Sequence, residues 1–106
     1  MPSQIYIELK NLLDDVTFWI KNNTYLKDEI CVRFHRRLVG IHLFPNGNGR
    51  HGRFACDLLA ESLGIEPFTW GGKDLYSEGE TRTAYITALK VADKNNYGPL
   101  LKFVRT

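Results

Sequence analysis

The sequence predicts an all-α fold, for three reasons. Apolar residues recur at spacings of three and four along several stretches, which is the pattern of helices with one buried face. Glycine, proline and asparagine separate these stretches, where breaks in the chain are expected. No stretch shows the strict alternation of a half-buried strand. We therefore expect the 106 residues to form one compact domain, residues 1–106, of about five helices.

The first expected helix runs from about residue 4 to residue 22, and polar, turn-prone residues end it. Its apolar stripe consists of Leu9, Leu12, Leu13, Val16, Trp19 and Ile20. A second helix is expected from about residue 27 to residue 41, with Asp28 and Glu29 in its first turn, where negative charge is favourable. The inward face of this helix consists of Ile30, Phe34, Leu38 and Ile41.

A basic cluster, residues 33–37, lies largely outside that inward face. Arg33, Arg36 and Arg37 could bind nucleic acid or an acidic partner, but such a face is more often solvated surface. The net charge of +2 is too small to argue for nucleic acid, so we do not expect that partner. His35 is expected to be a surface or capping histidine.

The third helix, from about residue 48 to residue 63, is expected to be central, because it carries arginines on one face and a wide apolar stripe on another. Asn48 can cap its start through the side-chain oxygen, and Gly64 is suited to close it in a left-handed conformation. A connector over residues 65–73 follows. Its aromatic residues Phe68 and Trp70 could form a floor under a base, although packing against the core is the more probable role.

Two further helices are expected in the last third of the chain. Residues 77–80 form a capping-box pattern that starts a fourth helix, whose inward residues are Tyr85, Ile86, Leu89 and Ala92. Pro99 opens a short terminal helix with Leu100, Leu101 and Val104 directed inward.

Residues 42–53 carry the strongest chemical signal in the chain. A histidine, a turn with two glycines and two arginines precede the third helix, whose first turn has backbone N–H groups without helical partners and the positive end of the helix dipole. Gly47 and Gly49 permit the turn to curl around a phosphate, and Arg50 and Arg53 fall on one helical face. His42, just upstream, can take a proton from an attacking group. The pattern predicts a phosphate site beside a general base.

This stretch resembles the active-site motif of Fic-domain proteins, which runs His-Pro-Phe-x-(Asp/Glu)-Gly-Asn-Gly-Arg-x-x-Arg. The matching residues are His42, Phe44, Gly47, Asn48, Gly49, Arg50 and Arg53. Leu43 replaces the usual proline, and Asn46 replaces the acidic residue. From about residue 5 onward the chain resembles one branch of that family, the "mobile mystery protein B" group, in residues 12–16, 68–72, 79–82 and 97–101.

The resemblance implies a Fic-like helical domain that transfers AMP from ATP, its substrate, to a hydroxyl of Ser, Thr or Tyr in a target protein. It makes His42 the general base and assigns phosphate binding to Asn46 and to the turn Gly47–Gly49, which includes Asn48. By the same resemblance Arg50 orients the β-phosphate, and Arg53 reaches the γ-phosphate.

Asn46 separates two expectations. The family's acidic residue at this position holds a magnesium ion, and a neutral amide oxygen is a poorer ligand for a hard dication. We expect weak but real AMP transfer, with magnesium possible but weakened. The alternative is a nucleotide-binding relative that transfers slowly or not at all and acts as a regulatory or toxin–antitoxin-like partner.

Other features indicate where the protein acts. The sequence has no leader pattern, no apolar run of membrane-spanning length, and two cysteines without the spacing of a zinc site. We expect a cytoplasmic protein with no membrane partner, in which Cys31 and Cys56 are reduced and buried. The resemblance also implies that the family's N-terminal flap is absent. Residues 62–66 do not match its inhibitory helix, so an inhibitor would be a separate protein or a missing N-terminal part.

Overall fold

The computed structural model describes residues 3–42, 47–72 and 79–106. Within these ranges the chain forms α-helices and one short 3-10 turn, and no strand occurs in them, so the all-α prediction is confirmed. The chain divides into two compact units, Met1–Ile65 and Glu66–Thr106. The single Fic-like domain over residues 1–106 stays a prediction. No helix among the described residues is long and apolar enough to cross a bilayer.

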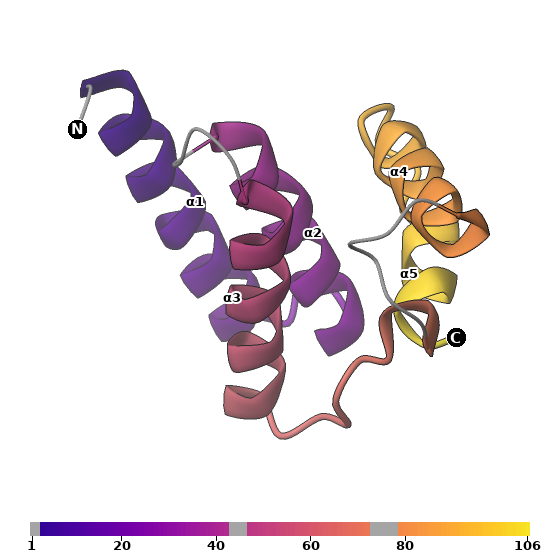
Figure 1. Ribbon diagram of the computed structural model, residues 1–106. Helices are drawn as coiled ribbons and strands as arrows, with labels where there is room; N and C mark the ends of the chain where they lie inside the picture. Colours follow the sequence, from indigo (N-terminus) through magenta and orange to yellow (C-terminus); the bar gives the residue numbers. More distant parts are fainter. Residues whose placement is uncertain (1–2, 43–46, 73–78) are drawn as a thin grey trace. The chain divides into compact units, whose positions relative to one another are not determined.

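Unit 1 consists of three helices, each running antiparallel to the one before it (Figure 1): α1 (Ser3–Asn22), α2 (Lys27–Ile41) and α3 (Asn48–Ser62). Their bounds agree with the predicted ones to within one residue. Gly64 has a positive φ of 73°, its N–H donates to the Glu61 carbonyl, and the Ile65 N–H donates to the Ala60 carbonyl. This is the predicted left-handed closure of α3.

An apolar cluster joins the three helices of unit 1. Its fully or nearly buried members are Leu12, Val16, Ile30 and Phe34, with Trp19, Tyr25, Leu38, Ile41, Ala55, Leu59 and Leu63 packed against them. The predicted inward face of α2 is therefore confirmed. The stripe predicted for α1 is too wide, because Leu13 and Ile20 are 50% and 39% exposed. The reason is that α1 packs mainly against one helix, α2.

The apolar stripe of α3 is also narrower than the sequence suggests. Phe54 and Leu58 are 65% and 52% exposed. The buried residues of α3 are instead small and spaced four apart: Gly52, Cys56 and Ala60. Residues four apart lie on one side of a helix, so this side can approach a neighbour closely. We call this packing of α3 against α2 the small-residue contact.

The α2 side of the small-residue contact includes His35, and the prediction of a surface or capping histidine is wrong. His35 is 0% exposed. A Cβ atom built on Gly52 would lie 2.7 Å from Cγ2 of Val39 and 3.1 Å from Nδ1 of His35. Further along, the Cys56 thiol donates to the Cys31 carbonyl at 3.4 Å. The small residues of α3 thus leave room for a ring on α2.

Both cysteines are buried free thiols, as predicted. Hydrogen bonding with Cys31, followed by burial, raises the pKa of the Cys56 thiol. Because the thiolate is the reactive form, this environment makes Cys56 a packing residue rather than a nucleophile.

Arginines of α2 make contacts within unit 1 instead of forming a purely solvated face. Arg33 pairs with Glu29 at 2.7 Å, and its guanidinium lies 4.1 Å from the ring centroid of Tyr25. Arg37 donates to Asp15 of α1 at 2.6 Å. The Arg37–Asp15 pair joins α2 to α1, and Arg33 lies over Tyr25 of the loop between the two helices.

Unit 2 consists of the 3-10 turn η1 (Trp70–Gly72), α4 (Glu80–Ala92) and α5 (Gly98–Val104) (Figure 1). Phe68 and Trp70 are 7% and 8% exposed and meet edge to face, with ring centroids 5.8 Å apart. Trp70 continues to Tyr85 of α4, and Tyr85 to Phe103 of α5. The two aromatic residues of the connector therefore pack in the core of this unit.

Three predictions for unit 2 need correction or qualification. Helix α4 begins at Glu80, with Gly79 at the N-cap and no side-chain capping bond. The predicted start directly after Ser77 is therefore too early, and Ser77 itself lies outside the described residues. Ile86 is 37% exposed, and Ala88 is the buried residue at this point of α4. In α5 the predicted Leu100 and Val104 are buried, whereas Leu101 is only half-buried.

Candidate nucleotide site

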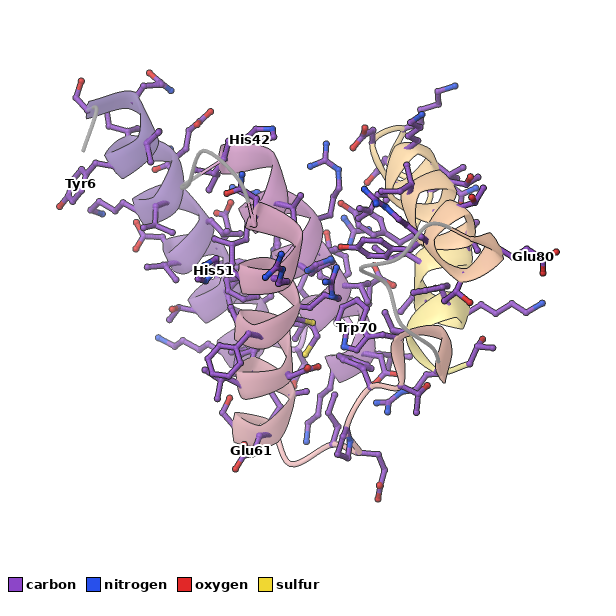
Figure 2. All side chains as sticks on the ribbon, in the orientation of Figure 1. Tyr6, His42, His51, Glu61, Trp70 and Glu80 are labelled. Carbon is purple, nitrogen blue, oxygen red and sulfur yellow. The ribbon has the colours of Figure 1, made fainter. Side chains whose placement is uncertain are left out.

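His42 occupies the C-terminal cap of α2. Its φ and ψ are 55° and 60°, in the left-handed region that non-glycine residues rarely adopt, and its N–H donates to the Val39 carbonyl at 3.3 Å. This conformation ends α2 at Ile41 and places an exposed imidazole at the helix end. Figure 2 shows His42 at the end of unit 1 where α2 finishes and α3 begins.

Gly47 occupies the N-terminal cap of α3 with φ of 75°, a conformation that suits glycine. The expectation that Asn48 caps the helix is wrong, because the left-handed Gly47 lets the helix begin one residue earlier and Asn48 is its first residue. Gly49 likewise lies inside the helix and has no positive φ. Only the first of the two glycines therefore needs its conformational freedom.

The first turn of α3 has the arrangement of an anion site. The first backbone bond of the helix runs from the His51 N–H to the Gly47 carbonyl at 3.1 Å. The amides of Asn48, Gly49 and Arg50 therefore precede the helical ladder and lie at the positive end of the dipole. A phosphate is the kind of ligand that such a helix start binds.

Arg50 and Arg53 lie in the first two turns of α3, three residues apart and so on neighbouring lines of the helix. Arg50 is exposed, whereas Arg53 is half-buried. The positive charge of Arg53 lowers the pKa of the buried His35 of α2. Arg50 therefore belongs to the outer surface of the site, and Arg53 stands at its inner edge beside the small-residue contact.

His51 is an exposed residue that the sequence analysis did not single out. A Cβ atom built on Gly47 would lie 3.8 Å from Cδ2 of His51, so the ring lies beside the helix start (Figure 2). The spacing of four residues along α3 was the available signal, since residues i and i+4 share a face. His51 adds a second imidazole to the surroundings of the first turn.

His35 is the second residue whose setting the sequence analysis missed. Burial lowers the pKa of His35 to about 4, a hydrogen bond with the Gly52 backbone opposes this, and the charges of Arg53 and Arg36 lower it further. His35 is therefore neutral at pH 7. A neutral ring can stay inside the small-residue contact, whereas a charged one could not remain there cheaply.

Asn46 lies outside the described residues, together with Leu43, Phe44 and Pro45. Within residues 3–42, 47–72 and 79–106, no group of three His, Cys, Asp or Glu side chains is placed to hold a metal ion. The described part of the site thus offers cationic and N–H groups to phosphate oxygens, and no oxygen cage for magnesium.

Comparison with known proteins identifies the family of this chain. Residues 1–60, which include α1, α2 and all but the last two residues of α3, match the Fic/DOC family. The chain belongs to the Fic/DOC family. Every described residue of the predicted site falls within the matched range.

Two nematode relatives extend the likeness of this Fic/DOC chain beyond residue 60. It is 27% identical over 106 residues to a protein adenylyltransferase fic-1 of Caenorhabditis elegans, covering 97% of this chain and 19% of that protein. It is 30% identical over 98 residues to the protein of the same name from Caenorhabditis briggsae, covering 91% and 18%. The chain thus spans about a fifth of the length of these relatives. No solved structure matches.

Proposed function

We propose that this chain transfers AMP from ATP to a hydroxyl side chain of a target protein. The observation that carries the proposal is the position of an exposed imidazole, His42, at the end of unit 1 where α3 begins with Arg50 and Arg53, in a Fic/DOC chain. The names of the nematode relatives, which describe adenylyltransferases, support the same chemistry.

In the proposed reaction His42 accepts the proton of a Ser, Thr or Tyr hydroxyl in the target. The hydroxyl oxygen then forms a bond to the α-phosphorus of ATP, and the bond between that phosphorus and the bridging oxygen of the β-phosphate breaks. Diphosphate leaves, and AMP remains on the protein. Negative charge develops at the β-phosphate, which is bound by the amides of Asn48 and Gly49 and by the guanidinium of Arg50. Arg53 binds the γ-phosphate.

Magnesium enters the proposal only as a weak participant. The residue at the family's metal position is Asn46, whose amide oxygen carries no charge, and the described residues hold no acidic cluster. We therefore assign stabilisation of the leaving diphosphate to the arginines and to the first turn of α3. An Asn46→Asp variant is expected to transfer AMP faster and to depend more strongly on magnesium.

The test uses two labelled forms of ATP, one carrying the label in the α-phosphate and one in the γ-phosphate, incubated with a cell lysate. Relative to the lysate alone, which contains its own kinases, added protein is expected to increase the α-label on protein and not the γ-label. The His42→Ala variant should lose about 100-fold or more of this labelling, because general bases contribute on that scale. Arg82→Ala, at an exposed arginine of α4, is the matched control and should label like the wild type.

Equal labelling by the wild type and His42→Ala would sink the proposed reaction. An increase in γ-label relative to the lysate alone would instead indicate transfer of a phosphate. Mass spectrometry of the labelled proteins then gives the added mass and the modified residue, and so identifies the target side chain.

A second candidate is favoured by Asn46. On that hypothesis the chain binds ATP without magnesium, transfers nothing, and serves as a regulator or as one half of a toxin–antitoxin-like pair with a separate inhibitory protein. Calorimetry with ATP, with and without magnesium, separates the two when it is combined with the labelling assay. ATP binding without any α-label transfer, also by Asn46→Asp, favours this candidate.

Two narrower proposals accompany the function. The chain is proposed to belong to the "mobile mystery protein B" branch, which the residue stretches 12–16 and 97–101 support. It is proposed to act in the cytoplasm, which the two buried free thiols support, because reducing compartments preserve them. Its partners would be the nucleotide and a protein bearing the accepting hydroxyl.

A further inference from the structure

The small-residue contact has no spare room at Gly52. A side chain as small as a methyl group there would lie 2.7 Å from Cγ2 of Val39 and 3.1 and 3.2 Å from ring atoms of His35. Both partners belong to α2, and His35 is fully buried. The distance between α2 and α3 at this level is thus set by a ring on one helix resting on the bare backbone of the other.

This contact lies between the groups of the candidate site. On α3, Gly52 is followed directly by Arg53 and is two residues after Arg50. On α2, His35 lies seven residues before His42, the residue that caps the helix. A shift of α3 at Gly52 would therefore move the arginines and the first-turn amides relative to His42.

We propose that His35 is a positioning residue of the nucleotide site: its ring, resting on Gly52, fixes the depth and rotation of α3 against α2. It touches no reacting atom. It acts through α3, by holding the amides of residues 48–50 and the guanidinium of Arg53 at a fixed place relative to His42. This use of the contact depends on the proposed function, whereas the positioning itself depends only on the packing of unit 1.

The ring can do this only while it is neutral. The charged groups that face it are Arg36, from its own helix, and Arg53, from α3. A proton on His35 would add a third positive charge in a buried place, and α3 would have to move away. Loss of the ring has the opposite effect, because α3 can settle into the space. A misplacement of groups in a site by about 1 Å can lower the rate of the catalysed reaction on the order of 100-fold.

The test compares three variants of the full chain: His35→Ala, His35→Gln and Val32→Ala. Gln keeps much of the ring's reach and can still donate to a backbone carbonyl. Val32 is 0% exposed on the same helix, so Val32→Ala is a loss of buried volume on α2 that leaves the His35 ring and Gly52 in place. Amide NMR shifts and hydrogen exchange of residues 47–53 report the position of α3, and calorimetry reports the Kd for ATP.

His35→Ala is expected to shift the amides of residues 47–53, speed their exchange, and weaken ATP binding about 10- to 100-fold. His35→Gln should restore binding to within about threefold, and Val32→Ala should leave both readouts near the wild type. The proposal is overturned if His35→Ala leaves those amides in place, or if Val32→Ala moves them equally.

The two proposals fail separately. If the wild type does not bind ATP, the proposed function fails, and the amide shifts still decide the role of His35. If His35→Ala does not fold, Gly52→Ala replaces it: that variant should shift the same amides, and adding Val39→Ala should partly return them. Amides that Gly52→Ala leaves unmoved would overturn the proposal.

Discussion

The α1–α2 side of unit 1 and the α2–α3 side near the site are packed in different ways. On the first side, Leu12 and Val16 of α1 meet Ile30 and Phe34 of α2 in an ordinary apolar cluster. On the second side a buried histidine rests on a glycine. The cluster buries large apolar side chains, whereas the small-residue contact is proposed to fix where α3 lies against α2. The two sides therefore differ in the size and polarity of the side chains that they bury, and the proposed control of site geometry belongs to the second.

The largest expected effect comes from breaking the apolar cluster. Leu12 is 0% exposed, and Leu12→Ala should cost unit 1 about 2–5 kcal/mol, since the change removes buried apolar surface and leaves a cavity. Urea unfolding followed through the amide signals of α2 measures the loss. Leu13→Ala, at a half-exposed neighbour, is the control and should cost well under half as much. Similar losses for the two variants would contradict the division between buried and exposed leucines.

The next effect is a dependence of stability on pH that arises from His35. Its pKa is about 4 in the folded chain and about 6.5 when unfolded, so the unfolded state binds more protons between these values. The contribution of His35 to the free energy of unfolding is fully present above pH 6.5. It falls as the pH drops toward 4, at ~1.4 kcal/mol per pH unit and by up to about 3 kcal/mol in all.

Unfolding of the wild type and His35→Gln, measured at intervals between pH 7 and pH 5, isolates this contribution. Carboxylates act mainly below that range, and they act in both proteins. The stability of the wild type should fall more steeply than that of His35→Gln. Parallel curves would mean that the ring is protonated as easily in the folded chain as in the unfolded one.

Replacing glycine by alanine is expected to change stability in opposite directions at two positions, Gly52 and Gly40. Gly52→Ala should destabilise unit 1 by about 1–3 kcal/mol, because the new methyl group meets Val39 and the His35 ring. At Gly40 of α2 the three nearest atoms among the described residues all belong to the end of the Arg36 side chain, which can move. Gly40→Ala should therefore stabilise the helix by about 0.5–1 kcal/mol. Thermal unfolding of the two variants side by side checks the signs, and a gain from Gly52→Ala would refute the tight fit.

Periodicity predicted the helices of unit 1 closely because their apolar residues and end signals agree. It predicted the residues of the apolar cluster, but it also put the exposed Leu13 and Phe54 in the apolar stripes of their helices. The spacing of apolar residues does not show how many neighbours a helix has. The motif put Arg50 and Arg53 in the opening turns of α3, where the structure has them, and their role in a nucleotide site with His42 stays a prediction. Periodicity could not place His35, because a polar residue between arginines resembles surface, and only the opposing Gly52 makes room for it.

The smallest expected effect lies on the surface of the α1–α2 side. Arg37 and Asp15 are joined at 2.6 Å, with side chains 36% and 51% exposed, so water screens much of their attraction. A double-mutant cycle with Arg37→Ala and Asp15→Ala should give a coupling of about 0.2–1 kcal/mol that weakens in 0.5 M salt. The pair Arg33–Glu29, at 18% and 27% exposure, is the matched comparison and should couple more strongly and resist salt better. A stronger coupling in the exposed pair would mean that burial does not determine the strength of these ion pairs. The arginines of α2 would then contribute through their stacking on Tyr25 and Trp19.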